Sequence, residues 1–597
     1  MKLRFALPLA AFLAIPPLVA QPASAPAAYS AEQAKAILDK TQEITLAPDL
    51  SRLGAQERQA VAKLLEAGAI FQRLYEEQRY AGMPRVRRLL AQAPAALRPA
   101  YLTLYRLFQG PIATNLENRR EPFLAVPDAP PGKNVYPADL TKAEMDAFLA
   151  AHPDARAGLM NPLSVVRRAD AASLSADLAT LRANPVLDIL HPGLRANLEQ
   201  RARRPDRRQL YAVPYSVAYA REMLVAHGLL NEAAALLEPS DAELAGYLRN
   251  RARDLLSDDY ESGDAAWVTA RFRRLNVQVG AYETYDDELY GTRAFYSLSL
   301  LLVRAEETAA IRRGMQGLQA VEDALPYDRH KKVREDIPVG AYDVIADFGQ
   351  SRGGNTASIL PNDALHARRY GRTILLRANI MRSPEIFSAG NAAWRAAVAP
   401  GHAADLTADS TFHRTLWHEV GHYLGVDRTA DGRDLDAALG ANGNLLEEMK
   451  ADLVSLFAGE ELRRRGYFTE AGLRSHYASG IFRTLQNVRP RREQPYQTMQ
   501  LMQMNWFLEN GVLRFDPASQ RLSIDYGRYR EAVTGLLREV LALQDRGDSA
   551  AADAFIARWS RWDDNLHGRI AANMRSQQRY RYRLFLYQAL DGAGARG

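Results

Sequence analysis

The stretch TLWHEVGHYLGV, residues 415–426, predicts a helix that carries two metal ligands. Apolar residues recur at helical spacing over residues 412–424, and the Asp, Ser and Thr at 409–411 are typical of a helix start. His418 and His422 are four residues apart, so their imidazoles project from one face of the helix, one turn from each other. Two imidazoles that bind one cation need this arrangement. The alternative is a pair of hydrogen-bonded core histidines.

Glu419 stands next to the first of these histidines, at the position of the general base in a metallohydrolase. Its carboxylate would reach a water activated by the metal without binding the metal itself. The chain contains no cysteine, so any metal must be held by histidine and carboxylate groups. The two histidines therefore need a third ligand from elsewhere in the sequence.

Two schemes could supply this third ligand. In one, a glycine three residues after the second histidine is followed three residues later by another histidine. Gly425 fits this scheme, but position 428 is an arginine and Asp427 is one residue out of register. In the other scheme, a second helix supplies a glutamate. The stretch NLLEEMKADLVSLFAGEEL, residues 444–462, has the apolar stripe of such a helix.

Glu448 and Asp452 lie four residues apart on one side of that second helix. A ligating glutamate, with a carboxylate one turn further on that orients a ligating histidine, is a common arrangement at metal sites. We therefore expect Glu448 to be the third ligand and Asp452 to be the partner of a histidine, with Asp427 as the alternative ligand. A solvated acidic face paired with Lys450 is the competing interpretation.

Length and composition indicate a folded protein with more than one core. A chain of 597 residues is too long for a single core, and 47% hydrophobic with 24% charged residues is ordinary for globular proteins. The net charge of +6 is small for this length, and the basic residues are interleaved with acidic ones, which argues against nucleic-acid binding. The stretch RSQQRYRYRLFLYQAL, residues 575–590, is accordingly expected to be a helix packed on the body.

The N-terminus predicts export. Lys2 and Arg4 precede an apolar run to Ala20, and small residues and prolines follow, which is the order of a secretory signal peptide over residues 1–25. Cleavage is expected after Ala20 or Ala25, and an uncleaved anchor is the alternative. The mature protein is expected to be periplasmic or secreted, without stable membrane association.

The secondary structure that the sequence indicates changes twice along the chain. Helical patterns dominate from residue 31 to about 257, and short apolar segments between turn residues indicate strands over 265–400. Helices return from residue 405 onward. This order predicts a mainly α protein with a smaller β core, which is an α+β fold.

Five stretches of the sequence are similar to motifs of one known family, and along the chain they follow the same order as in that family. They are HEVGH at 418–422, EEMKAD at 447–452, PPGKNVYP at 130–137, GAYETYDDELYG at 280–291 and LPNDALHARRYGRTILLRAN at 360–379. Together they resemble the dipeptidyl-peptidase III family of zinc metallopeptidases, in its bacterial, exported branch with the five-residue HExxH motif. The resemblance covers roughly residues 120–515.

This resemblance implies two lobes separated by a wide cleft, in which a helical lobe carries one zinc ion per chain and faces a lower lobe with a β core. Residues 31–300 would form a mostly helical N-terminal region and the start of the lower lobe, residues 301–400 a mixed segment that bridges the lobes, and residues 401–597 the helical zinc-binding catalytic lobe. A monomer that acts on short peptides is expected.

The same resemblance implies roles for individual residues. Matched by motif, they are the zinc ligands His418, His422 and Glu448, the catalytic base Glu419, the supporting acid Asp452, the transition-state-stabilising Tyr285, and the substrate-binding Glu283 and Asn362. Without the resemblance, Tyr285, Glu283 and Asn362 would be interpreted as ordinary strand-end or turn residues.

The chain departs from the family at one point. The family places a histidine and, four residues later, an arginine before a helix that ends in Glu-x-Gly, and both face the reacting carbonyl. The matching stretch LMQMNWFLENG, residues 501–511, puts Tyr496 and Gln500 at these substrate-binding positions. His476 and His567 are possible substitutes, although a surface or packing role is expected of both. We therefore expect slow turnover of the family's usual substrates.

The predicted function is zinc-dependent peptide hydrolysis, with removal of dipeptides from the N-termini of short peptides. Glu419 would take a proton from a water activated by zinc, and Tyr285 would donate to the developing oxyanion. Two alternatives stay open: a peptide-binding protein that keeps zinc and catalyses little, and a metallohydrolase that acts on a non-peptide amide.

Overall fold

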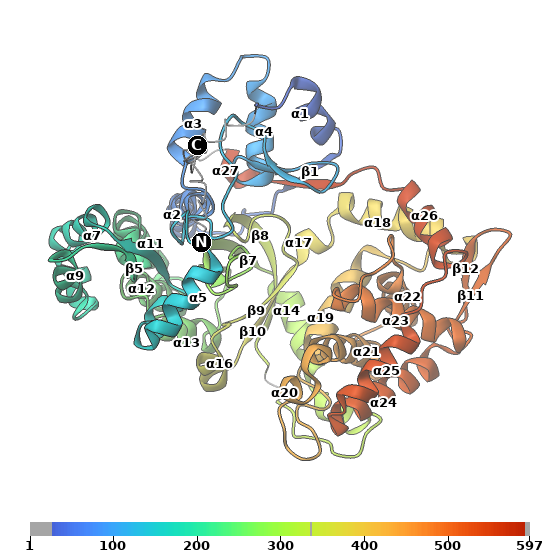
Figure 1. The fold of residues 1–597 in the computed structure, drawn as a ribbon. Helices are drawn as coiled ribbons and strands as arrows, with labels where there is room; N and C mark the ends of the chain where they lie inside the picture. Colours follow the sequence, from blue (N-terminus) through green and yellow to red (C-terminus); the bar gives the residue numbers. More distant parts are fainter. Residues whose placement is uncertain (1–26, 335–336, 592–597) are drawn as a thin grey trace, which may run out of the picture.

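The computed structural model describes residues 27–334 and 337–591 (Figure 1). The predicted signal peptide, residues 1–25, lies outside this part of the chain. Within the described residues, no helix combines the length and the apolar character that crossing a membrane requires.

A five-stranded mixed sheet stands at the centre of the molecule. Its strands, in spatial order, are β6 (Leu275–Glu283), β7 (Phe295–Val303), β8 (Val339–Gly349), β10 (Thr373–Arg377) and β9 (Ala357–Leu360). The pairs β6–β7, β7–β8 and β9–β10 are antiparallel, whereas β8 and β10 run parallel, with Ile374 opposite Val339. The strands predicted over residues 265–400 are therefore confirmed.

Two large hydrophobic cores meet at this sheet. Along β10, Ile374 and Leu376 belong to one core and Leu375 to the other, because successive side chains of a strand point to opposite faces. A strand that is buried on both faces carries a continuous apolar run, which explains the aliphatic triplet in TILLR. The sheet is thus shared by the core under β6 and the core under the HEVGH helix.

The helices gather on both sides of the sheet, with the green α7, α9, α11 and α12 on one side and the orange to red α21–α25 on the other (Figure 1). Those that precede the sheet in sequence are α1 (Ala31–Leu38), α2 (Ala55–Arg79), α3 (Met83–Gln92), α4 (Arg98–Phe108), α5 (Lys142–Ala151), α6 (Arg156–Leu159), α7 (Ala171–Ala183), α8 (Pro185–Leu190), α9 (Leu194–Ala202), α10 (Tyr215–Ala218), α11 (Ala220–Leu237), α12 (Ala242–Ser257) and α13 (Glu261–Thr269).

Some helices connect the strands of the sheet, and others follow it. The connecting helices are α14 (Ala305–Met315), α15 (Leu318–Asp323) and α16 (Ala364–Tyr370), and the last strand is followed directly by α17 (Ala378–Met381) and α18 (Pro384–Ala397). The later helices are α19 (Ala408–Gly421), α20 (Leu435–Leu439), α21 (Gly443–Arg464), α22 (Glu470–Thr484), α23 (Pro495–Glu509), α24 (Tyr529–Arg546), α25 (Ser549–Trp559), α26 (His567–Ser576) and α27 (Gln588–Asp591). The α+β fold class is confirmed, while the two lobes, the cleft and the domain boundaries stay predictions.

Four two-stranded sheets complete the fold, and all four lie in regions that the sequence indicated as mainly helical. They are β1 (Thr41–Leu46) with β13 (Tyr582–Tyr587), β2 (Ile112–Thr114) with β3 (Arg120–Pro122), β4 (Ser164–Ala169) with β5 (Asp206–Pro214), and β11 (Leu513–Asp516) with β12 (Arg521–Ile524).

The helix predicted for residues 575–590 is wrong over most of its length. Only its first residues belong to α26, and residues 582–587 form β13, which pairs in parallel with β1. Phe585 and Tyr587 are buried in the same core as β6. Alternating aromatic and aliphatic residues suit a strand whose partner is available, and here that partner comes from the opposite end of the sequence.

Candidate metal and active site

The HEVGH motif lies at the end of α19. The helix begins at Ala408, slightly before the predicted start at 409–411, and Thr407 precedes it. His418 lies inside the last turn and His422 directly after it, still in a right-handed helical conformation. The two imidazole centroids are 4.9 Å apart. The predicted one-turn spacing is therefore confirmed, and both rings lie on the same side of the helix end.

The glycine within the motif allows a second helix to approach. A Cβ atom on Gly421 would lie 2.6 Å from the backbone oxygen of Ala451 on α21, closer than real contacts allow. A larger side chain at this position would therefore push α19 and α21 apart. After the motif, Gly425 adopts a positive φ of 76° that turns the chain away from the helix.

This close packing brings Glu448 of α21 to the two histidines. Its Oε2 lies 3.3 Å from Nε2 of His418 and 3.9 Å from Nε2 of His422. One ligand atom from each residue can be chosen so that all three lie within 4.8 Å of one another. Oε2 is buried and accepts no well-formed hydrogen bond from the described residues. The group could hold a metal ion.

Each histidine is held from behind by a carboxylate. Asp452 places Oδ1 2.8 Å from Nδ1 of His418, as the sequence spacing predicted. Glu447 places Oε1 3.0 Å from Nδ1 of His422, a contact that the sequence analysis missed. Both contacts leave Nε2 of each imidazole directed toward Glu448, which is how outer carboxylates orient the histidines of a metal site.

Lys450 contradicts the interpretation of this helix face as solvated. Its side chain is 2% exposed, and Nζ lies 2.8 Å from Oε1 of Glu447 and 2.8 Å from the backbone oxygen of Leu424. The lysine therefore ties α21 to the turn that follows His422. Glu447, which is partly exposed, and the buried Lys450 form an ion pair that supports the second histidine.

Electrostatics keep the supporting carboxylates charged. Burial alone would raise the pKa of Glu447, but Lys450 and His422 outweigh it and lower the pKa to about 2. Burial opposes ionisation of Asp452 as well, yet Arg483 and His418 hold its pKa far below the usual range. Burial lowers the pKa of His418 and Asp452 raises it more strongly, to about 9. Without a bound cation, a protonated His418 thus supplies the positive charge that these carboxylates favour.

Glu419 differs from the other carboxylates of the site. It is half-buried, and no hydrogen bond or ion pair engages it within the described chain. Its charge is nevertheless felt by the pKa values of His418 and Arg414, although burial is the main influence on both, so it lies close to the ligand group. A carboxylate that lies near a metal-binding group and has no hydrogen-bond or ion-pair partner is available to take up a proton.

Two arginines close to the group were missing from the sequence analysis. Nε of Arg483, on α22, lies 2.8 Å from Oδ2 of Asp452, and Nη1 of Arg414 lies 3.7 Å from Oδ1 of the same residue. Burial lowers the pKa of Arg483, whereas Asp452 and then Glu448 raise it more. No spacing rule connects Arg483 to the motifs, because the packing of α22 against α21 sets its position.

The residues matched at the end of β6 lie together. Nδ2 of Asn362 donates to the backbone oxygen of Tyr282 at 3.2 Å. Burial raises the pKa of Glu283, while hydrogen bonds from Asn362 and Tyr285 oppose it. The Tyr285 side chain is 84% exposed. These residues therefore form one cluster, with a tyrosine that reaches outward from it.

Tyr496 links this cluster to the metal-binding group. Its hydroxyl donates to Oε1 of Glu448 at 2.9 Å. Burial first, then Glu448, raises the pKa of Tyr496, and the charge of Tyr285 adds to the effect. Tyr285 is therefore near enough to Tyr496 for its charge to influence that hydroxyl, which is itself bonded to the metal-binding group.

Gln500 and the two candidate substitute histidines are engaged elsewhere. The Gln500 side-chain oxygen accepts a 2.8 Å hydrogen bond from Gln486. His476 is fully buried, stacks on Phe468 and contacts a backbone oxygen at 3.1 Å. His567 contacts the side chain of Asn505 at 2.9 Å. Both histidines thus have the packing roles that were expected of them.

Asp427, the alternative third ligand, does not join the metal-binding group. Its side chain is 70% exposed, and Oδ2 lies 3.3 Å from Nζ of Lys331. Within the described residues, the histidine and carboxylate group with metal-binding geometry is His418, His422 and Glu448.

Comparison with known proteins identifies the fold. No family model matches the chain. The plant protein Nudix hydrolase 3 of Arabidopsis thaliana is 24% identical over 564 residues, which cover 87% of this chain and 70% of the plant protein. The chain resembles a solved structure of dipeptidyl-peptidase III from Caldithrix abyssi with a TM-score of 0.79 and 22% identity, over 94% of this chain and 100% of that one. A second solved structure of dipeptidyl-peptidase III, from Corallococcus sp. strain EGB, matches with a TM-score of 0.71 and 24% identity, over 95% of this chain and 100% of that one. The chain therefore has the fold of dipeptidyl-peptidase III structures, as its motifs predicted.

Proposed function

We propose that this protein is a zinc-dependent peptidase that removes dipeptides from the N-termini of short peptides. The observation that carries the proposal is the group of His418, His422 and Glu448, which stands beside the unpaired carboxylate of Glu419. Two imidazoles and one carboxylate are a common ligand set of catalytic zinc, and three protein ligands leave a further position open. The likeness to dipeptidyl-peptidase III structures supports a peptide as the substrate.

The residues of the site divide the work of hydrolysis. A zinc ion bound here would polarise the scissile carbonyl and make a water molecule more acidic. Glu419 would accept the proton of the attacking water and pass it on to the leaving amine. Tyr285 would donate a hydrogen bond from its hydroxyl to the oxygen on which negative charge develops. Asp452 and Glu447 would hold the two histidines in orientation.

The cluster at the end of β6 suits the free end of a peptide. Glu283 is half-buried, and no lysine or arginine pairs with it in the described part of the chain. Its carboxylate would bind the ammonium group of a peptide N-terminus, and Asn362 would bind the peptide backbone. A fixed distance between this anchor and the metal-binding group would set the length of the fragment that is released.

The decisive test is the digestion of a peptide library with mass spectrometry of the products. We expect dipeptides from free N-termini, and no products from the same peptides after N-terminal acetylation. Internal cleavage would contradict the exopeptidase assignment. Binding without products would favour the alternative of a zinc-containing peptide-binding protein, and turnover of other amides alone would favour a non-peptide metallohydrolase.

We expect Tyr496→His combined with Gln500→Arg to raise kcat on standard dipeptidyl substrates. Neutral hydrogen-bond donors are worth roughly half as much as charge-assisted ones, and one transition-state donor is worth on the order of a hundredfold in rate. Zinc content, measured on the same samples, separates this gain from the loss of the hydrogen bond that Tyr496 donates to Glu448. A slower double variant would mean that these positions do not face the carbonyl, and Gln500, which contacts Gln486, would be the first to reconsider.

We also propose that the protein is exported. The order of charged, apolar and small residues at the N-terminus supports this. N-terminal sequencing of the protein from its native cells should find Gln21 or Pro26 as the first residue. A cytosolic protein that begins at Met1 would refute export.

A further inference from the structure

A pocket lies at one end of the central sheet. It has a volume of about 350 Å³. Its lining comes from the first residues of β6, β8 and β10, the last residue of β7, one face of α14, and the end of α13 with the segment that follows it. Neither the metal-binding group nor the strand-end cluster contributes a residue to its lining. Its chemistry can therefore be considered independently of peptide hydrolysis.

Positive charge dominates this pocket. Four exposed arginines line it, and none of the described residues in its lining is an aspartate or glutamate; the arginines are Arg271, Arg273, Arg312 and Arg313. None of the four side chains forms an ion pair with a carboxylate in residues 27–334 and 337–591. The carboxylates of Asp241 and Glu243 lie nearby, but they accept hydrogen bonds from the backbone N–H groups of Arg273 and Arg271.

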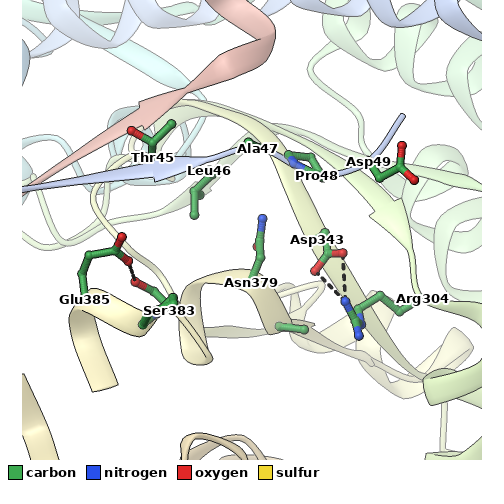
Figure 2. Close-up of a pocket in the computed structure, with 12 residues that line it drawn as sticks. Thr45, Leu46, Ala47, Pro48, Asp49, Arg304, Asp343, Asn379, Ser383 and Glu385 are labelled. Carbon is green, nitrogen blue, oxygen red and sulfur yellow. Dashed lines mark hydrogen bonds and ion pairs between the residues drawn. The ribbon is translucent and has the colours of Figure 1, made fainter. Parts of the chain in front are cut away.

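The unpaired arginines of this pocket differ from the arginine that lines another polar pocket of the structure. That pocket, of about 300 Å³, lies between β1 and α18, and Figure 2 shows Arg304 directed at Asp343. Arg304 is neutralised there by Asp343 at 3.0 Å and by Glu307 at 2.6 Å, and Ser383 donates to Glu385 at 2.6 Å. Its charged groups are satisfied within the chain, so it offers no comparable site.

The floor of the arginine pocket holds a free hydroxyl. Thr373 is only 7% exposed, lines the pocket, and its Oγ1 has no hydrogen-bond partner within the described chain. Burial raises the pKa of Tyr342, which also lines the pocket, while Asn276 and then the charge of Arg312 oppose this rise. Trp267, in the same lining, is fixed by a 2.9 Å hydrogen bond from Nε1 to Asn276. A buried hydroxyl without a partner in the chain can donate to an atom from outside it, and an oxygen of a ligand in this pocket would be in position to accept.

We propose that this pocket binds a compact, multiply charged anion of the phosphate type, such as pyrophosphate. Planar guanidinium groups bind phosphate oxygens through paired hydrogen bonds, and several unpaired arginines around one concavity raise the local concentration of anions. The volume lies at the lower end of the range for small-molecule pockets, which suits a small ligand. Thr373 donates one hydrogen bond from the floor, while the arginines hold the charged oxygens at the rim.

The test is calorimetric titration of the full mature chain with inorganic pyrophosphate at constant ionic strength. We expect saturable binding at one site, weakened at least tenfold in Arg273→Ala/Arg312→Ala and several-fold in Thr373→Val. The matched control is Arg514→Ala/Arg538→Ala, which removes two other exposed and unpaired arginines and should bind as the unaltered chain does.

Lysine replacements separate charge from geometry. Arg273→Lys/Arg312→Lys keeps both charges but loses the paired hydrogen bonds, so it should bind pyrophosphate more weakly than the unaltered chain and more tightly than the alanine pair. The proposal is overturned by the absence of saturable binding, or by an equal loss in the two alanine pairs, which would reduce the effect to general charge attraction. Peptide hydrolysis is not part of this measurement, so the two proposals fail independently.

Discussion

Glu419→Gln is expected to lower the rate of peptide hydrolysis by about a hundredfold to ten-thousandfold, the range that a general base contributes. Glutamine keeps the shape of the side chain but cannot take up a proton. Because Glu419 is not engaged by any hydrogen bond or ion pair in the described structure, the substitution should disturb little else. The change should appear in kcat rather than in KM, because the proton is transferred in the transition state.

Metal analysis of the same variant distinguishes lost chemistry from lost metal. Zinc content should equal that of the unaltered chain, because Glu419 is not among the three residues with metal-binding geometry. Asp409→Asn, on the same helix but with a largely exposed carboxylate, serves as the matched control and should keep full activity. Undiminished turnover in Glu419→Gln would refute the proposed mechanism.

Glu448→Ala should remove most of the zinc. Loss of a supporting carboxylate costs metal affinity about 10-fold to 100-fold in other sites, and loss of a direct ligand should cost more. The substitution leaves His418 and His422 with an open side where Oε2 of Glu448 lay 3.3 and 3.9 Å from their Nε2 atoms. The measurement is zinc retained after dialysis against a weak chelator, in parallel with competitive titration to determine affinity.

Two further variants give this result a scale. Glu447→Ala removes the carboxylate behind His422 and should weaken zinc binding by the smaller factor expected for a supporting residue. Glu460→Ala, also on α21 but paired with Arg463 at 3.1 Å, should leave binding unchanged. If Glu448→Ala keeps its zinc, the third ligand must lie elsewhere. Asp427 would then be a poor replacement, because it is exposed and paired with Lys331.

Local spacing explains why part of the site could be predicted. His418 and His422 share a helix, as do Glu448 and Asp452, and four-residue spacing on a helix fixes which side chains lie together. Glu447 was missed for a related reason. Next to Glu448 and three residues before Lys450, it looks like half of a surface ion pair, and only the packing of α19 on α21 shows that Lys450 is buried and that Glu447 contacts His422. Spacing within one helix gives no information about the neighbouring helix.

The β structure marks another limit of the sequence. Strands of the central sheet were predicted because short apolar runs alternate with turn residues over 265–400. β13 was not, since its partner β1 lies about 540 residues earlier in the chain and nothing local announces the pairing. Aromatic and leucine side chains in β13 fit either conformation, and the tertiary partner decided between them.

The pairing of β1 with β13 also bears on the order in which the protein can assemble. Phe585 and Tyr587 fill the same core as residues of α2 and β6, so this core stays incomplete until nearly the whole polypeptide has left the ribosome. Contacts between distant parts of a sequence form late, because a long loop must close first. A chain that stops short of residue 582 would leave the edge of β1 unpaired and open to another strand. Premature termination before codon 582 would therefore yield a product prone to self-association, even if it contained all residues of the metal-binding group.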